Sequence, residues 1–332
     1  MIRTILLRSR TLGVLALPLF AAGVLSGQTV LTLNPAAGEL PVSIAFDKGG
    51  NAWVSLQNVC QLRQYAPDWH EISRVQFPAD CSGGAGASGL AFDSEGQLYA
   101  AAIGPDGVRG VYIISRHGEA RRLPGTESMA FPNALAFERE DGALFVTDMA
   151  AGAIWRIPRR WEHDRDWDED EWTPSFGLPK LWISGAIFES PVGYGVNGLA
   201  IQRGHVIVSV TYPDRIVSIP IREDGRAGTP KILADTAALN AAYVFAIDDI
   251  TLDIFGNIYG SEIAAVPGVV VISADGKQIT HVADAPAAVT SVAFGNRGKN
   301  RRALFAVFNQ AFGGTGSGVA RFDMDVAGQP LP

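Results

Sequence analysis

The chain of 332 residues repeats one strand-rich unit, and this repeat restricts the possible fold more than any other feature. The unit is clearest from Pro132 to Ile157, where turn residues separate the apolar runs of PNALAFEREDGALFVTDMAAGAIWRI. Short apolar runs between turn residues are typical of antiparallel strands. Further copies of the unit contain the aligned residues at positions 42, 88, 197, 248 and 290.

The spacing between the copies predicts a β-propeller. By subtraction, the aligned positions 42, 88, 133, 197, 248 and 290 lie 46, 45, 64, 51 and 42 residues apart. A period of roughly 40 to 50 residues made of strands is typical of one propeller blade. We therefore expect an all-β fold with six four-stranded antiparallel blades. Because the last copy is one strand short, we expect the N-terminal segment QTVLTLN to close the ring as its outer strand.

Residues 1–27 predict a secretory signal peptide. Three arginines precede the apolar run TLGVLALPLFAAGVL, and small residues follow it. A basic start, a short apolar run and a small-residue exit are typical of such leaders, with an uncleaved membrane anchor as the alternative. We expect a secreted protein, periplasmic or extracellular, with one propeller domain over residues 28–332 and no membrane association after cleavage.

The acidic segment at 159–177, RRWEHDRDWDEDEWTPSFG, accounts for the longest gap between copies. Its alternating aspartates resemble a calcium loop, but they lack the turn glycine and the final glutamate at the required spacing. We interpret the segment as a solvated insertion in the third blade. The formal net charge of the whole chain is −7, so no basic surface for nucleic acid is indicated.

The chain has two cysteines, Cys60 and Cys81. In an exported protein an isolated pair of this kind predicts a disulfide, and two free thiols are the alternative. The propeller pattern places both in connections that emerge on the same face of the ring. The sequence has neither a CxxC motif nor a Cys/His cluster that would indicate zinc.

Polar residues recur at the start of the innermost strands, which face the channel of a propeller. The aligned residues are Val42, Ser88, Asn133, Asn197, Asp248 and Thr290. Carboxylate and carboxamide oxygens that converge on one channel suit a hard divalent cation, and Glu39 lies just upstream of the first position. The alternative is that these side chains only cap the strand entrances.

These positions also carry a resemblance to the gluconolactonase, regucalcin and luciferin-regenerating enzyme family of six-bladed propellers. The segment GELPV, which contains Glu39, resembles the family's GExPV entry, and Asn133 and Asn197 lie in PNAL and VNGL. Asp248 begins DDIT, where the family usually has PDG and an apolar residue, and alignment favours it over Asp249. The resemblance implies that Glu39, Asn197 and Asp248 bind one divalent metal ion, with Asn133 beside it as a water-mediated or substrate contact.

The function that this resemblance implies is metal-assisted hydrolysis of a lactone or a related small ester. We expect Ca²⁺, with Zn²⁺, Mg²⁺ or Mn²⁺ as alternatives, and catalytic roles for Asp248 and Asn133. In this hypothesis the metal polarises the carbonyl group and Asp248 takes a proton from water. We expect a monomer acting on a small molecule. The competing hypothesis is a propeller that binds small ligands or protein partners without chemistry.

Overall fold

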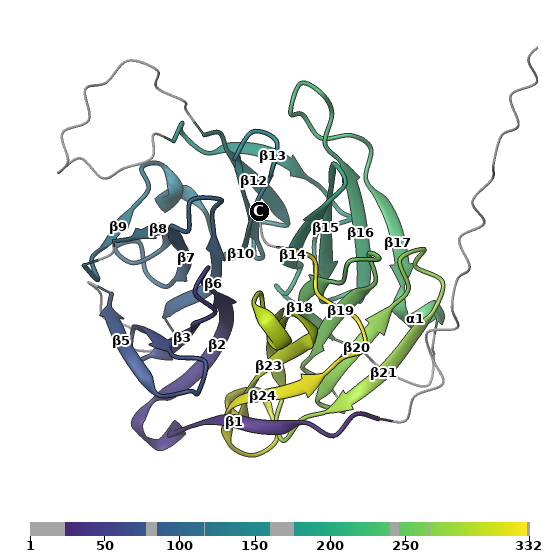
Figure 1. Ribbon diagram of the computed structural model, residues 1–332. Helices are drawn as coiled ribbons and strands as arrows, with labels where there is room; N and C mark the ends of the chain where they lie inside the picture. Colours follow the sequence, from purple (N-terminus) through teal and green to yellow (C-terminus); the bar gives the residue numbers. More distant parts are fainter. Residues whose placement is uncertain are drawn as a thin grey trace, which may run out of the picture.

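The apolar runs of the six sequence copies fold into six sheets, each of four antiparallel strands. The sheets stand around a central axis like the blades of a propeller (Figure 1). The computed structural model describes residues 24–77, 85–115, 117–159, 176–239, 246–264 and 266–330. The predicted six-bladed β-propeller is therefore confirmed.

Within blades 1 to 3 the first strand lies next to the axis, and the next three strands follow outward in chain order. Blade 1 consists of β2 Glu39–Phe46, β3 Ala52–Asn58, β4 Gln61–Tyr65 and β5 Glu71–Gln76. Blade 2 consists of β6 Gly86–Phe92, β7 Leu98–Ile103, β8 Gly110–Ile114 and β9 Ala120–Arg122. Blade 3 consists of β10 Pro132–Phe137, β11 Leu144–Asp148, β12 Ala153–Ile157 and β13 Lys180–Ser184.

Blades 4 and 5 follow the same order, and blade 6 completes the ring. Blade 4 consists of β14 Val196–Gln202, β15 His205–Val210, β16 Arg215–Pro220 and β17 Lys231–Asp235. Blade 5 consists of β18 Ile247–Leu252, β19 Ile258–Glu262, β20 Gly268–Ile272 and β21 Ile279–Asp284. Blade 6 consists of β22 Val289–Phe294, β23 Ala303–Asn309, β24 Ser317–Asp323 and β1 Gln28–Leu33. Because β1 pairs with β24 as the outer strand, the predicted closure of the ring is confirmed.

Each blade buries its faces against its neighbours. Every one of the six apolar clusters formed by the described residues joins two adjacent blades. Between blades 6 and 1, for example, the ring centroids of Phe46 and Phe305 lie 4.8 Å apart. A single sheet of this sequence would leave both apolar faces in water, so the blades are stable as a closed set.

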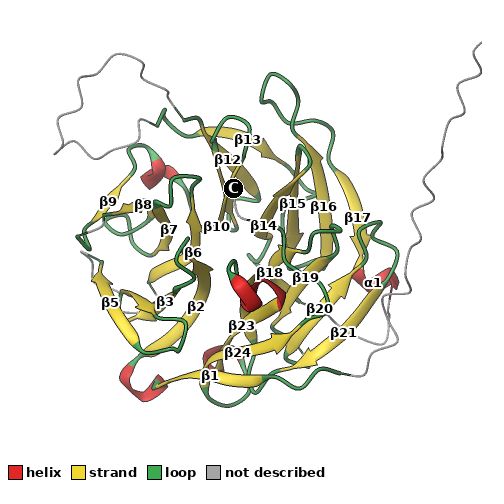
Figure 2. Cartoon of the chain, viewed as in Figure 1, coloured by secondary structure: helices red, strands yellow, loops and turns green. Residues whose placement is uncertain are grey.

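Helical segments are short and lie in the connections between strands (Figure 2). The single α-helix of the described residues is α1, Thr236–Leu239, which follows the last strand of blade 4. The repeat predicted strands alone, so this one turn of helix is a small departure from the expected pattern.

No helix in the described part of the chain combines the length and apolar character needed to cross a membrane.

Two predicted segments lie largely outside the described residues. The predicted signal peptide, 1–27, is described only from Val24 onward, where the Leu25 amide donates to the Val282 carbonyl at 2.7 Å. The acidic insertion is described only at its two ends, where Arg159 pairs with Phe176. Cleavage of the leader and solvation of the insertion therefore stay predictions.

Cys60 lies buried in the turn between β3 and β4, on the connection where the sequence pattern placed it. Cys81 lies outside the described residues. The Cys60–Cys81 disulfide therefore stays a prediction.

The C-terminal segment crosses one end of the central channel, where the first and second strands of each blade are joined. The Gly328 amide donates to the Arg301 carbonyl of blade 6 at 2.9 Å, and the Gln329 amide donates to the Leu252 carbonyl of blade 5 at 2.8 Å. The Gln329 side chain then donates to the Ile201 carbonyl of blade 4 at 2.9 Å. Figure 1 shows this yellow end of the chain passing in front of the ring.

Ring closure predicts a sensitive site at Gly318 in β24. A Cβ added there would lie 2.0 Å from the Leu31 carbonyl oxygen of β1, so the paired strand would have to move. We expect Gly318→Ala to lower the free energy of unfolding by about 1–3 kcal/mol, measured by urea denaturation. Gly107→Ala is the control, because a Cβ there has no atom within 4 Å. Equal stability of the two variants would contradict this packing of β1 on β24.

Candidate functional site

Every innermost strand carries a β-bulge at the position that the sequence alignment singled out. The pairing of first and second strands shifts at or next to Val42, Ser88, Asn133, Asn197, Asp248 and Thr290. A bulge interrupts the ladder, bends the strand and redirects a side chain. The aligned residues are therefore the points where each inner strand departs from regular pairing.

Hydroxyl groups on second strands hold these bulges and connect neighbouring blades. Ser209 Oγ accepts from the Gly198 amide of its own blade at 2.8 Å and donates to the Asp248 carbonyl of the next blade at 2.7 Å. Thr147 and Ser55 make the corresponding pair of hydrogen bonds from blade 3 to blade 4 and from blade 1 to blade 2. Each such hydroxyl thus fixes two adjacent bulges relative to one another.

The side chains of Asn133, Asn197 and Asp248 form one hydrogen-bonded chain across blades 3, 4 and 5. Asn133 Nδ2 donates to Asn197 Oδ1, and Asn197 Nδ2 donates to Asp248 Oδ1. Asn197 Nδ2 also donates to Thr211 Oγ1 at 3.0 Å, and Asn197 is buried. Three of the four predicted site residues therefore meet at the axis.

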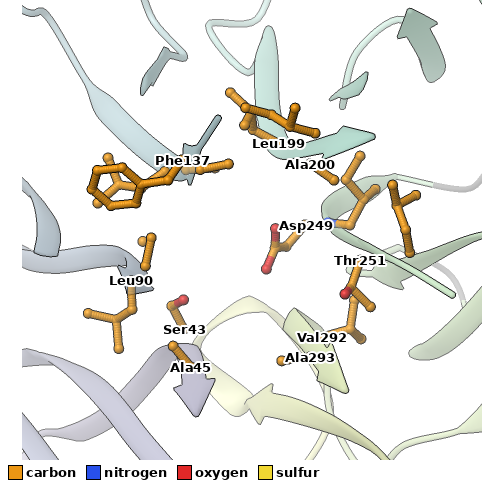
Figure 3. Close-up of a pocket in the computed structure, with 18 of the residues that line it drawn as sticks. Ser43, Ala45, Leu90, Phe137, Leu199, Ala200, Asp249, Thr251, Val292 and Ala293 are labelled. Carbon is orange, nitrogen blue, oxygen red and sulfur yellow. Dashed lines mark hydrogen bonds between the residues drawn. The ribbon is translucent and has the colours of Figure 1, made fainter. Parts of the chain in front are cut away.

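Asp249 contributes a second carboxylate beside Asp248. Its side chain extends into the central opening (Figure 3), accepts from Ser291 Oγ at 2.7 Å and accepts from the Ile250 amide at 2.8 Å. The sequence alignment favoured Asp248 as the residue facing the channel. At this bulge Asp248 points toward Asn197 and Asp249 points into the opening, so both carboxylates belong to the site.

The pKa values of the two adjacent carboxyl groups lie close to neutral pH. Burial, and then the charge of Asp249, raise the pKa of Asp248 to about 7. Burial likewise raises the pKa of Asp249 to about 6, although the hydrogen bond from Ser291 acts in the opposite direction. Near neutral pH these groups can both take and give a proton.

Glu39 does not join this group, in contrast to the expectation from its sequence motif. Its carboxylate pairs with Arg63 Nη1 of β4 at 2.8 Å and accepts from the Asn34 amide at 2.8 Å. Partial burial raises the pKa of Glu39, but the hydrogen bond from the Asn34 amide and the neighbouring Arg63 guanidinium outweigh this effect. The pKa of Glu39 therefore lies below its usual value. The predicted ligand set of Glu39, Asn197 and Asp248 is therefore brought together only in part.

A cavity of about 380 Å³ occupies the centre of the ring. Asn133, Asn197, Asp248 and Asp249 line it where the innermost strands begin, and Gln329 lines it where those strands end. A cavity of this size can hold a small molecule with a few precisely placed polar contacts. The predicted site residues thus border a ligand-sized space.

The donor atoms gathered here suit a hard divalent cation. Carboxylate and carboxamide oxygens are the usual ligands of Ca²⁺ and Mg²⁺. No three His, Cys, Asp or Glu side chains converge into a metal-holding group in the described ranges. A cation at this site would therefore depend on the amide oxygen of Asn197 as well as on Asp248, with Asn133 beside it.

The hydroxyl contacts correspond to a recurrent Ser or Thr in the sequence, which the repeat pattern did not identify as part of the site. A Ser or Thr lies 11 to 13 residues after the amide that it binds in blades 1, 3, 4 and 5. These are Ser55, Thr147, Ser209 and Ser261. Their recurrence near the end of the second strand is visible in the repeat, but their partners become evident only once the blades are placed side by side.

Known structures share this fold over nearly its whole length. A regucalcin from Agrobacterium tumefaciens, described as a calcium-binding protein, is 16% identical with a TM-score of 0.65, covering 94% of this chain and 98% of its own. A gluconolactonase from Xanthomonas campestris is 16% identical with a TM-score of 0.61, covering 95% and 99%. A luciferin-regenerating enzyme is 14% identical with a TM-score of 0.63, covering 92% and 98%. No family model and no curated protein matches the sequence.

The hydroxyl contacts predict that Ser209→Ala destabilises the ring at the site. The change leaves the Gly198 amide and the Asp248 carbonyl without their partner, and an unsatisfied buried group costs about 1–3 kcal/mol. We expect the midpoint of thermal unfolding to fall accordingly, measured by calorimetry. The matched change Ser94→Ala, at an exposed residue, should leave it unchanged. A Ser209→Ala midpoint equal to that of the parent would contradict the proposed contact.

Asp214 should make the stability of the protein depend on pH. Its Oδ1 accepts from the Ile247 amide at the start of β18, at 3.4 Å. Burial raises the pKa of Asp214 to about 7, whereas an unfolded aspartate titrates near about 3.9. The stabilisation that the folded protein gains by binding this proton is complete below the unfolded pKa. It is lost progressively as the pH rises from there through about 7. Against Asp214→Asn, the parent should lose up to about 1.4 kcal/mol of unfolding free energy per pH unit in this window. Parallel pH profiles for the two proteins would contradict the raised pKa.

Proposed function

We propose that the protein hydrolyses a lactone or a related small ester in its central channel. The observation that carries this proposal is the Asn133–Asn197–Asp248 chain at one end of a cavity of about 380 Å³. It joins a carboxyl group poised near neutral pH to amide donors within one ligand-sized space. The fold shared with a gluconolactonase supports the choice of reaction.

In the proposed reaction a water molecule adds to the carbonyl carbon, the ring C–O bond breaks, and a hydroxy acid is formed. Asp248 takes the proton from the water and returns it to the ring oxygen as that oxygen leaves. The second N–H of Asn133 Nδ2 makes only a long contact with Met149 Sδ, at 4.0 Å, and in the proposed reaction it turns to donate to the carbonyl oxygen, where negative charge develops. Asn197, held by Thr211, positions the other two side chains.

We further propose that one divalent cation, Ca²⁺ in the first instance, is held by Asn197 and Asp248 with Asn133 beside it. When bound, such an ion supplies Lewis acidity that polarises a carbonyl oxygen and lowers the pKa of water. Zn²⁺, Mg²⁺ and Mn²⁺ remain alternatives, because oxygen donors do not select among them. We leave Glu39 out of this set because Arg63 holds its carboxylate.

The ion pair of Glu39 with Arg63 also favours a second candidate function. With one of three expected ligands engaged elsewhere, the channel could serve as a binding site without chemistry. In that case the cavity would hold a small ligand that leaves unchanged.

Export, the Cys60–Cys81 disulfide and a monomeric state complete the proposal. The monomeric state rests on the closed ring, which needs no partner for its stability. Export rests on the sequence of residues 1–27, and the disulfide rests on the isolated cysteine pair. An oxidising compartment outside the cytosol would be consistent with both features.

The direct test compares the parent with Asp248→Ala on a panel of lactones and small esters. We expect the variant to lose about 100-fold or more in kcat/KM, because the proton acceptor is removed. Asp106→Ala is the control, since that side chain is 93% exposed and lies in a turn of blade 2.

Unchanged turnover in Asp248→Ala would exclude the proposed site. A parent that hydrolyses none of the panel with added Ca²⁺ or Zn²⁺, yet binds a member of it, would favour the binding function.

A further inference from the structure

A ring of small side chains lines the channel below the polar residues. Three positions after the aligned bulge residue, the innermost strands carry Ala45, Ala91, Ala136, Ala200, Thr251 and Ala293. All six border the cavity and are half-buried, whereas the residue before each is buried between blades. We refer to these six residues as the alanine ring.

Figure 3 shows how this ring relates to the polar end of the site. Ala45, Ala200, Thr251 and Ala293 surround the same opening into which the Asp249 carboxylate points. Six methyl groups, five from alanines and one from Thr251, and the Thr251 hydroxyl therefore form the wall at this level. A molecule bound at the carboxylates that extends into the alanine ring meets an almost wholly apolar wall there.

We propose that the alanine ring receives an unbranched alkyl chain of the substrate, so that the substrate is an alkyl-substituted lactone or ester. This inference rests on the proposed function, because it places the reacting group at Asp248 and Asp249. Hydroxyl groups of a polyhydroxylated lactone would lose water at the ring and find one partner there, Thr251. Methylene groups instead gain by leaving water, by about fourfold in affinity for each.

The small size of the ring side chains sets the width of the proposed chain. Because an alanine methyl extends little from the strand, the ring leaves space on the axis that larger residues would fill. The far end of the space is bordered by charged residues, among them Glu138, Arg139 and Arg203, and by Gln329, whose side chain is fixed to the Ile201 carbonyl at 2.9 Å. The ring therefore accommodates a slender chain, and the C-terminal segment limits its length.

The test uses a series of γ-lactones that differ only in their alkyl substituent, which has no, four or eight carbons. Gluconolactone is measured in parallel as the polyhydroxylated comparison. We expect KM to fall by about fourfold for each added methylene until the chain reaches the C-terminal segment. Ala200→Leu and Ala136→Leu, which narrow the ring, should raise KM for the octyl lactone by about tenfold or more. The unsubstituted lactone, which has no alkyl chain to place in the alanine ring, is the reference, and the rise in KM should be at least about fivefold larger for the octyl lactone than for it.

The control variant is Ala237→Leu, the same change at an exposed position of α1. Equal thermal midpoints for the three variants show that the ring substitutions leave the fold intact. Gluconolactone as the best substrate, no dependence on chain length, or an equal effect of Ala200→Leu on every lactone would overturn the proposal.

A second measurement separates failure of this inference from failure of the proposed function. Calorimetry with the corresponding alkyl lactams, which resist hydrolysis, tests the ring without turnover. Binding that strengthens with chain length, and weakens in Ala200→Leu, would support the ring even if no lactone is hydrolysed. Absence of lactam binding at every chain length would overturn it.

Discussion

Hydrogen bonds from second-strand hydroxyls to the bulges of adjacent blades fix the geometry on which the rest of this structure depends. A blade cannot bury its own apolar faces, so hydrophobic packing brings the blades together but does not by itself set their height along the axis. Ser209, Thr147 and Ser55 add that directional constraint, because each binds one bulge in its own blade and one in the next. The polar side chains at those bulges consequently meet at one level of the channel.

This arrangement gives the channel a polar level at the bulges and an apolar level at the alanine ring, beyond which polar and charged residues border its far end. The alanine-ring residue lies three positions after the bulge residue in every blade, so in blades 2 to 6 one short segment supplies both a polar group and part of the wall. Burial of Asp248 and Asp249 beside this wall raises their pKa values toward neutrality. Under the proposed function, carboxyl groups beside this apolar wall favour a substrate that is polar at one end and alkyl at the other.

The sequence predicted the six-bladed propeller and the position of the site along its axis, because the repeat determines which residues occupy equivalent places in each blade. It could not predict the partner of Glu39, since Arg63 reaches it from a strand two places outward in the blade. It also could not settle the roles of Asp248 and Asp249, because a bulge lets consecutive residues face the same space. The small residues of the alanine ring were visible as a repeated pattern, but their direction became clear only from the folded strands.

The central claim is that Asn133, Asn197 and Asp248, without Glu39, form the site at the axis. Calorimetric titration of Mn²⁺ into the parent, Asn197→Ala and Glu39→Gln tests it most directly. We expect Mn²⁺ to bind the parent and Glu39→Gln with closely similar affinity, and to bind Asn197→Ala about tenfold or more weakly. Loss of binding in Glu39→Gln, with binding retained in Asn197→Ala, would contradict it.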